Sequence, residues 1–517
     1  MRSHDALERR PARGHEPYAR STRTTAYVSL TLIGILLAAT ARETAPKALA
    51  IGLALMFVTM AAFFIKPTIG ICAVVFFTLI GDDFSAPWYP VVKGFSARES
   101  MMFISNKLIV SPLEMCLLAG VAALLVSYLR KGVWPFRLGP VGPALLALEF
   151  FVVVAVVYGV ATGGDRHIAL FQARPFFVFF GVFLLVASIC RTRADYRHVL
   201  WSALAAALVH SIIALIFVAS IKKGVSVLPE SLFDHGAIMR MDVLIVVVIA
   251  SWTFRGNAKR QRLTTTAMLL PVVVVYMISV RRSAIIALCA ALILVFIVLF
   301  WRQRRTFMKV VPLCALLVAA YTGAFWNSQS SIAFPAQAVK SVISPGQATE
   351  RNQGSDEYRT IENFDLNYTI RANKVLGLGL GKAFYRPIAL PSLGGFLLNG
   401  YLPHNSILAL WINFGFGGFT AFFCLLGRSL QFGGAKLRSV EPGQDLTVLC
   451  AFVAGIVIFV VFSSVDIAFG GENMTMFAMC LAAATNYPTS RRAQALAPGS
   501  VTADTVVAPS KALVGRP

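Results

Sequence analysis

Fourteen long apolar stretches dominate this chain of 517 residues and restrict what it can fold into. A membrane-spanning helix needs about 17–25 mostly apolar residues. Hydrocarbon offers no water, so a spanning segment must satisfy its own backbone hydrogen bonds, which helices do. The stretches do not alternate as strands would, and several are short. We therefore predict an all-α, polytopic membrane helical bundle of about 12–14 spans. The candidate spans are 26–41, 48–65, 68–81, 108–129, 141–161, 175–190, 198–220, 241–254, 263–280, 283–301, 310–326, 404–427, 446–465 and 473–487.

Composition and charge support this class. The chain is 57% hydrophobic and 14% charged, whereas a soluble domain is about 45–50% apolar and roughly 25% charged. In a soluble protein, a net charge of +23 would indicate a nucleic-acid binding partner. If the N-terminus lies on the inner side and successive spans cross the membrane in alternate directions, both termini lie on that side. It then holds 28 of the 47 Lys and Arg residues and only seven acids. Because cations collect in cytoplasmic loops, we predict cytoplasmic termini and no nucleic-acid partner.

The spans divide the chain into five parts. The motif Ala39-Thr40-Ala41 also fits a cleaved signal peptide, although we favour an uncleaved first span. The last part is rich in Ala, Pro, Thr and Val, which is typical of disorder. The parts are a basic cytoplasmic tail (1–25), a first set of spans (26–326), a large periplasmic loop (327–403), three further spans (404–487) and a disordered cytoplasmic tail (488–517).

The loop 327–403 is much longer than most other outer loops, and loops of such length are usually functional or disordered. Its segment 350–372 is polar and compatible with a helix. Alternating glycines follow at Gly377, Gly379 and Gly381, and they allow tight turns and close backbone approach. A phosphate loop would need a GxxxxGK[ST] motif, which is missing. We favour a packed turn over a phosphate cradle.

His404 follows Pro403 at the end of this loop. We expect it in the first turn of a span at the outer interface, where Leu408, Trp411 and Gly415 share its face. Histidine has an unperturbed pKa of about 6.5, so His404 can be a general base. The alternative is a histidine that caps the helix.

Arg281 and Arg282 interrupt the apolar segment 263–301 on the outer side, where topology does not require cations. Ionisable residues in such places are costly and usually functional. Arginine binds phosphate oxygens in a bidentate manner, and the alternative is contact with lipid headgroups. Arg240 precedes a span on the same side, and Asp242 could be its partner.

Four acids complete the candidates. Glu114 and Glu149 lie inside apolar spans, where they would couple protons in a transporter or hydrogen-bond a neighbouring helix. Asp466 and Glu472 flank a short outer loop. We expect this loop to reach the same cavity as His404.

The loop end, PHNSILALWINFGFGG, resembles the O-antigen ligase/polymerase family of bacterial membrane glycosyltransferases. His404-Asn405 and the glycines 415–418 fit that family's His-Asn pair and following Gly-x-x-Gly. Residues 374–379 are similar to its Pro-x-x-Gly-x-Gly motif, with lysine for proline. Arg359 matches an upstream arginine, and Arg282 with the next two residues is similar to a Ser-Arg-Gly motif. The resemblance covers roughly 230–480.

This resemblance implies a GT-C-like fold and an inverting, metal-independent glycosyltransferase without cofactors in the bacterial inner membrane. It would transfer or polymerise glycan from polyprenyl (undecaprenyl) diphosphate to a hydroxyl at the periplasmic face, in O-antigen or exopolysaccharide biosynthesis. His404 would accept the hydroxyl proton, and Asn405 and Asp466 would support it. Cations would stabilise the departing diphosphate. These are Arg282, Arg240, Arg359 and Arg281.

The acceptor stays open at this stage. It is a second lipid-linked glycan for a polymerase, or lipid A core or another hydroxyl for a ligase. The main alternative is a multi-span secondary transporter or flippase that uses Glu114 and Glu149 near the midplane. A non-catalytic assembly scaffold is a third interpretation.

Overall fold

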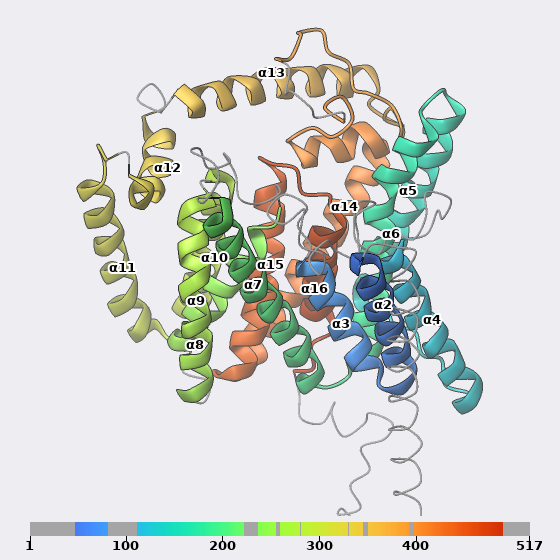
Figure 1. Ribbon diagram of the computed structural model, residues 1–517, viewed down its shortest axis with the longest axis horizontal. Helices are drawn as coiled ribbons and strands as arrows, with labels where there is room; N and C mark the ends of the chain where they lie inside the picture. Colours follow the sequence, from blue (N-terminus) through green and yellow to red (C-terminus); the bar gives the residue numbers. More distant parts are fainter. Residues whose placement is uncertain are drawn as a thin grey trace, which may run out of the picture.

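The computed structural model describes residues 47–80, 111–221, 236–254, 259–279, 281–328, 330–344, 350–391 and 398–489, and every regular element in these ranges is a helix (Figure 1). The first candidate span, the N-terminal tail and residues 490–517 lie outside them. The α-helices are α2 (Lys47–Ile65), α3 (Pro67–Ile80), α4 (Pro112–Lys131), α5 (Gly142–Ala161), α6 (Arg166–Ile189), α7 (Arg193–Ile221), α8 (Met239–Thr253), α9 (Lys259–Ser279), α10 (Arg282–Arg302), α11 (Arg304–Ala324), α12 (Phe334–Ile343), α13 (Glu350–Ala372), α14 (Ser406–Ser439), α15 (Gln444–Ser463) and α16 (Gly471–Asn486).

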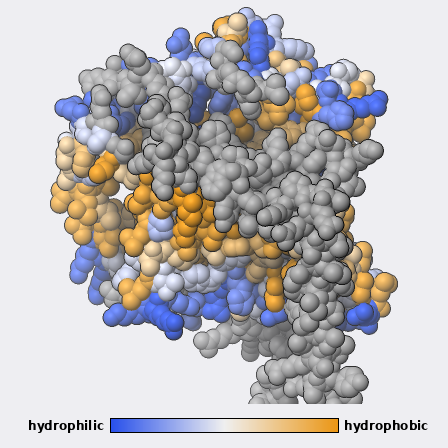
Figure 2. Space-filling model, viewed as in Figure 1, coloured by the Kyte–Doolittle hydropathy of each residue, from blue (hydrophilic) through white to orange (hydrophobic). Residues whose placement is uncertain are grey.

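Thirteen of these helices coincide with the candidate spans from the second to the fourteenth. Within the described ranges, nine helices are long and apolar enough to cross a membrane, and α2 and α3 contribute shorter apolar segments. Figure 2 shows a belt of hydrophobic side chains between a hydrophilic upper end, where α13 lies, and a hydrophilic lower end. The predicted all-α polytopic membrane fold is confirmed.

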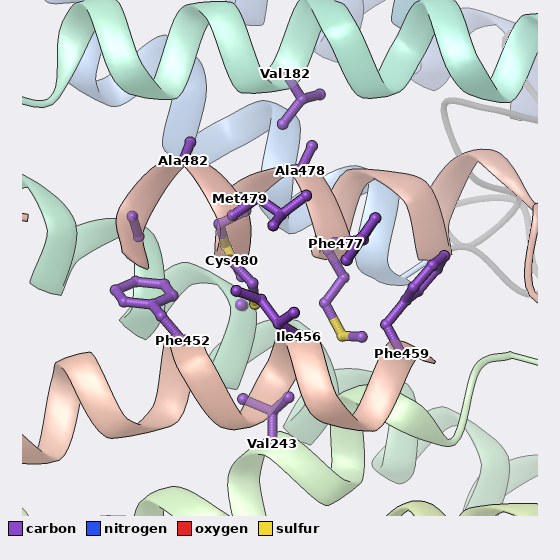
Figure 3. Packing of buried hydrophobic residues seen from close by; sticks show 14 of the residues in the cluster. Val182, Val243, Phe452, Ile456, Phe459, Phe477, Ala478, Met479, Cys480 and Ala482 are labelled. Carbon is purple, nitrogen blue, oxygen red and sulfur yellow. The ribbon is translucent and has the colours of Figure 1, made fainter. Parts of the chain in front are cut away.

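The last two helices form the centre of the bundle. Helix α15 packs on α8 and α10, and α16 packs on α6. The rings of Phe459 and Phe477 stack with centroids 4.0 Å apart at the α15–α16 contact. Val182 of α6 and Val243 of α8 close this core from either side (Figure 3). Close approach is possible because Gly455 has no side chain where Cys480 packs.

Helix α11 is the opposite case. Although it is apolar from Val310 to its end, none of its residues is buried. It contacts α10 and α12 and lies at the edge of the bundle (Figure 1). Such a helix is stable only where lipid covers it, because apolar surface of this extent is unfavourable in water.

The connections between helices gather at two ends, as the alternation of spans predicts. At the lower end, Arg193 pairs with Asp445 at 2.6 Å. At the upper end, the Asp165 amide donates to the Gly381 carbonyl at 2.8 Å. Which end faces the cytoplasm stays a prediction from the distribution of charge.

Two helices exceed their predicted bounds by more than two turns. Helix α6 begins at Arg166, capped by Asp165, so Pro175 lies inside it rather than at its start. Helix α14 continues to Ser439, so the cytoplasmic loop expected at 428–438 is helical. The reason is packing, since small and apolar side chains at four-residue spacing keep one face buried here. They are Ser429, Gly433 and Leu437.

Candidate functional site

Helix α13 crosses the upper end of the molecule and supplies most contacts of the candidate site (Figure 1). The polar segment 350–372 was expected to be helical, and α13 has these bounds. Its residues reach Arg282 through Asn352 and Asp356. Farther along, Tyr358 and Glu362 reach His404. The helix therefore joins the arginine pair to the loop end, which are more than 100 residues apart in sequence.

Arg282 begins α10 and is held in a fork by Asp356. Its two terminal nitrogens donate to the two carboxylate oxygens at 2.9 and 2.7 Å. Two weaker contacts follow, to the Ser341 hydroxyl at 3.4 Å and the Asn352 carbonyl at 3.3 Å. The Asp356 side chain is 48% exposed and that of Arg282 only 14%. The guanidinium thus has bidentate geometry for an anion, and the carboxylate that fills it faces solvent.

Arg281 has a different partner, Asp466. Its guanidinium lies 3.6 Å from the Asp466 carboxylate, which also accepts a hydrogen bond from Ser283 at 3.0 Å. The Asp466 backbone carbonyl accepts the Ser406 hydroxyl at 3.1 Å. Because Ser406 begins α14, Asp466 ties the arginine pair to the helix that follows His404. The predicted proximity of the loop 466–472 to His404 agrees with these contacts.

His404 lies before α14 rather than in its first turn, which corrects the prediction. The cap is Asn405, whose side chain accepts the Leu408 amide at 3.0 Å and donates to Asn363 at 3.2 Å. A histidine two residues before the first helical residue has no capping role. The expected shared face also ends early, because Gly415 has φ 63° and breaks α14 there.

The His404 environment comes from α13. Its Nδ1 lies 3.2 Å from Glu362 Oε1, and its backbone amide donates to Glu362 Oε2 at 3.0 Å. The Tyr358 ring meets the imidazole edge to face with centroids 5.4 Å apart, and its hydroxyl donates to Asn399 at 2.8 Å. Burial and the nearby Glu362 charge raise the pKa of Tyr358 to about 12, so this phenol stays neutral.

The cluster around Arg282 and the cluster around His404 are both attached to α13, so the spacing of residues along this helix relates them. Asp356 and Glu362 are six residues apart, which is about 9 Å along a helix axis. Helical periodicity puts Arg359 on the same face as Asp356 and Asn363, between the two clusters. We therefore expect Arg359 to lie on α13 between the residues that contact Arg282 and those that contact His404.

The stretch with Gly377, Gly379 and Gly381 lies between α5 and α14. Several of its backbone amides donate hydrogen bonds to other parts of the protein. The Leu378 amide donates to Ile412 at 2.6 Å, that of Leu380 to Ala155 at 2.9 Å, and that of Gly381 to the Gln172 side chain at 2.8 Å. These amides cannot also cradle a phosphate. The geometry favours the packed turn over the phosphate loop.

Arg240 does not pair with Asp242, so that prediction is wrong. Arg240 is 3% exposed and donates to the Ala237 carbonyl at 2.9 Å. Asp242 is fully buried, and the polar side chain that it faces is Tyr276 of α9. Residues two apart on a helix point to different sides, which separates the two.

The two acids proposed for proton coupling differ. Glu114 closes a capping box with Ser111 at the start of α4 and pairs with Arg174 at 2.9 Å. This favours the structural interpretation. Glu149 has one buried oxygen without a hydrogen-bond partner among the described residues.

Two functional candidates escaped the sequence analysis, Asp356 and Glu362. The sequence predicted their helix, but their partners are 74 and 42 residues away. No local spacing indicates which acid on a polar helix faces a given arginine or histidine.

A cavity of about 250 Å³ lies at the opposite end of the molecule, between the starts of α7 and α15. Its arginines already have partners. Arg193 pairs with Asp445, and Arg197 donates to Gln444, each at 2.6 Å. We interpret this region as a tie between helices.

Among the described residues, no group of three His, Cys, Asp or Glu side chains is arranged to hold a metal ion. Residues 266–423 match the family described as O-antigen ligase. This stretch of the chain is similar to an O-antigen ligase domain. No curated protein matches the chain.

The family match confirms the resemblance inferred from sequence over this stretch. The O-antigen ligase domain runs from the middle of α9 through the first part of α14, and it includes Arg281, Arg282, Arg359, His404 and Asn405. Arg240 and Asp466 lie outside it. The match supports glycan transfer at a membrane, from a lipid-linked donor to an acceptor, by a multi-pass protein.

Proposed function

We propose that this protein is a glycosyltransferase of the bacterial inner membrane that transfers glycan from polyprenyl diphosphate to a hydroxyl at the periplasmic face. Its termini would be cytoplasmic. One observation carries the proposal. Within the O-antigen ligase domain, a single helix, α13, contacts both the forked arginine Arg282 and His404.

The donor would bind through its diphosphate. A diphosphate carries more negative charge than a carboxylate, and the spacing of its oxygens suits bidentate binding by a guanidinium group. It would replace Asp356 at Arg282, and the half-exposed Asp356 side chain can turn toward water. Arg359 on the same face would meet the second phosphate, and Arg281 would add charge from the other side.

Transfer would be a single inverting displacement. The acceptor oxygen attacks the anomeric carbon while the bond from that carbon to the diphosphate oxygen breaks. The diphosphate leaves with the electron pair, and arginines stabilise the charge that develops on it. His404 accepts the hydroxyl proton, a contribution of typically 10²–10⁴-fold in rate. Asn405 supports this step because it fixes the start of α14 beside His404.

A deletion strain tests the proposal directly. Surface polysaccharide from the strain is separated on a gel and compared with that of the complemented strain. Single-repeat products identify a polymerase, and lipid-linked polymer with a bare acceptor identifies a ligase. Unchanged polysaccharide would contradict both forms of the proposal.

A transporter remains the second candidate because of the unpartnered buried oxygen of Glu149. Uptake into proteoliposomes that requires Glu149 and tolerates His404→Ala would favour it. The O-antigen ligase match favours glycan transfer.

A further inference from the structure

The two oxygens of the Glu362 carboxylate both contact His404. Oε2 accepts the His404 backbone amide at 3.0 Å, and Oε1 lies 3.2 Å from Nδ1 of the same histidine. Glu362 is 1% exposed, and the His404 side chain is 15% exposed. A buried carboxylate must be satisfied by donors. Both oxygens are therefore acceptors toward His404.

The contact between Glu362 Oε1 and His404 Nδ1 determines which ring nitrogen carries the imidazole proton. A carboxylate oxygen can only accept, so Nδ1 must carry a hydrogen. In the neutral ring Nε2 then has none, and it is the nitrogen that can accept a proton. The second bond, to the backbone, fixes the main chain of the same residue and so limits rotation of the ring.

Tyr358 completes the support. It precedes Glu362 by four residues on α13, so both side chains lie on one face of the helix. Its ring packs edge to face on the imidazole, and its hydroxyl is held by Asn399. Helix α13 thus contacts the imidazole at Nδ1 through Glu362 and elsewhere on the ring through Tyr358.

We propose that Glu362 is the positioning residue of this site, which holds His404 in the Nδ1–H tautomer and directs Nε2 to the acceptor hydroxyl. This inference rests on the proposed function, since it concerns how the proposed base is prepared. Glu362 itself does not touch substrate and is not a catalytic residue.

The substitution Glu362→Gln tests this because an amide has one acceptor and one donor. The backbone amide of His404 can only donate, so the glutamine oxygen must face it. The glutamine NH₂ group then faces Nδ1, which has to become an acceptor. The imidazole proton moves to Nε2, and the base is blocked although the size of the side chain is nearly unchanged.

The first measurement is ¹⁵N solid-state NMR of histidine-labelled protein in liposomes, with the His404 signal assigned from its loss in His404→Gln. We expect the Nδ1–H tautomer in the wild type and the Nε2–H tautomer in Glu362→Gln. A wild-type imidazolium at neutral pH, an Nε2–H tautomer in the wild type, or no change in the variant would overturn the inference. None of these outcomes depends on glycan transfer.

The second measurement is transfer kinetics. When an acid that orients a catalytic histidine is replaced by its amide, kcat falls about 10⁴-fold in the well-studied serine proteases. We expect a loss of about 10³-fold or more in kcat, with the donor KM nearly unchanged. Glu362→Asp retains the charge with a shorter reach and should recover part of the rate.

Asp365→Asn is the matched control. Asp365 is a buried acid one turn along α13 that accepts the Ile388 amide at 3.2 Å. The control should keep the His404 tautomer and most of the activity. Full transfer by Glu362→Gln after a tautomer switch would refute the positioning role alone, whereas full transfer by His404→Ala would refute the proposed base.

Discussion

The Arg282 guanidinium and the Asp356 carboxylate meet at two points, 2.7 and 2.9 Å apart, across 74 residues of sequence. This pair attaches the start of α10 to α13. It also means that the cation best suited to a diphosphate already holds an anion. Donor binding at this site would be an exchange of anions rather than the filling of an empty site.

Removal of the resident carboxylate should therefore strengthen donor binding. For Asp356→Asn we expect the dissociation constant of undecaprenyl diphosphate to fall about two- to fivefold, because the half-exposed Asp356 carboxylate is partly screened by water and competes only weakly for Arg282. Binding is measured with purified protein in micelles. Weaker binding would show that Asp356 supports the donor site rather than competing for it.

Arg282→Lys retains the charge and loses the fork, so it should weaken the same ligand by about tenfold or more. Arg371→Lys is the control, since Arg371 is an exposed arginine in the last turn of α13. The control should bind as the wild type does. Equal affinity in both variants would remove Arg282 from the donor site.

His404→Ala should lose glycan transfer by about 10²–10⁴-fold, because no other side chain is proposed to accept the hydroxyl proton. Expression and membrane insertion should be unchanged. The matched variant is His167→Ala, which removes an exposed histidine at the same end of the bundle. A polysaccharide gel of the complemented deletion strain reports both, and normal glycan from His404→Ala would exclude the proposed base.

Gly379→Ala should destabilise the bundle. Gly379 has φ 78°, and an alanine Cβ would lie 2.6 Å from the Gly159 Cα on α5. The left-handed conformation alone costs roughly 1–2 kcal/mol for a residue with a Cβ. The thermal midpoint in detergent should fall by several degrees.

Gly354→Ala is the paired substitution for stability. Gly354 lies inside α13 with nothing within 4 Å of its Cβ direction. Alanine is the better helix former by about 0.5–1 kcal/mol. The thermal midpoint should therefore stay the same or rise.

Glu149→Gln separates glycan transfer from transport. The Glu149 side chain lies in α5, whereas the described contacts to His404 and Arg282 come from α13. We expect glycan transfer to be nearly unchanged in the gel assay. A complete loss with normal insertion of the protein would revive the transporter interpretation.

The helices could be predicted from sequence because hydropathy alone determines which segments cross a membrane. The bounds of α13 followed from polarity in the same way. The end of α14 did not, because its burial depends on Gly433 fitting against Val453 of another helix. Span predictions fail where side-chain packing continues beyond the apolar segment.

Some residues of the candidate site could likewise be predicted from sequence, and others could not. His404, Arg281 and Arg282 were recognised because a charge or a histidine beside an apolar span is locally unusual. Glu362 and Asp356 are ordinary acids on a polar helix, and only tertiary structure selects them. The pairing of Arg240 with Asp242 failed because proximity in sequence does not bring helical residues two apart together.

The burial of the last two helices has a consequence for biogenesis. Helices α15 and α16 are translated after the other described helices, yet they occupy the centre of the bundle, against α6, α8 and α10. Earlier helices must enter the bilayer with the surfaces for these partners still facing lipid. A ribosome that stops before Gln444 would leave that centre vacant. The bundle therefore cannot close around its centre until both helices have entered the membrane.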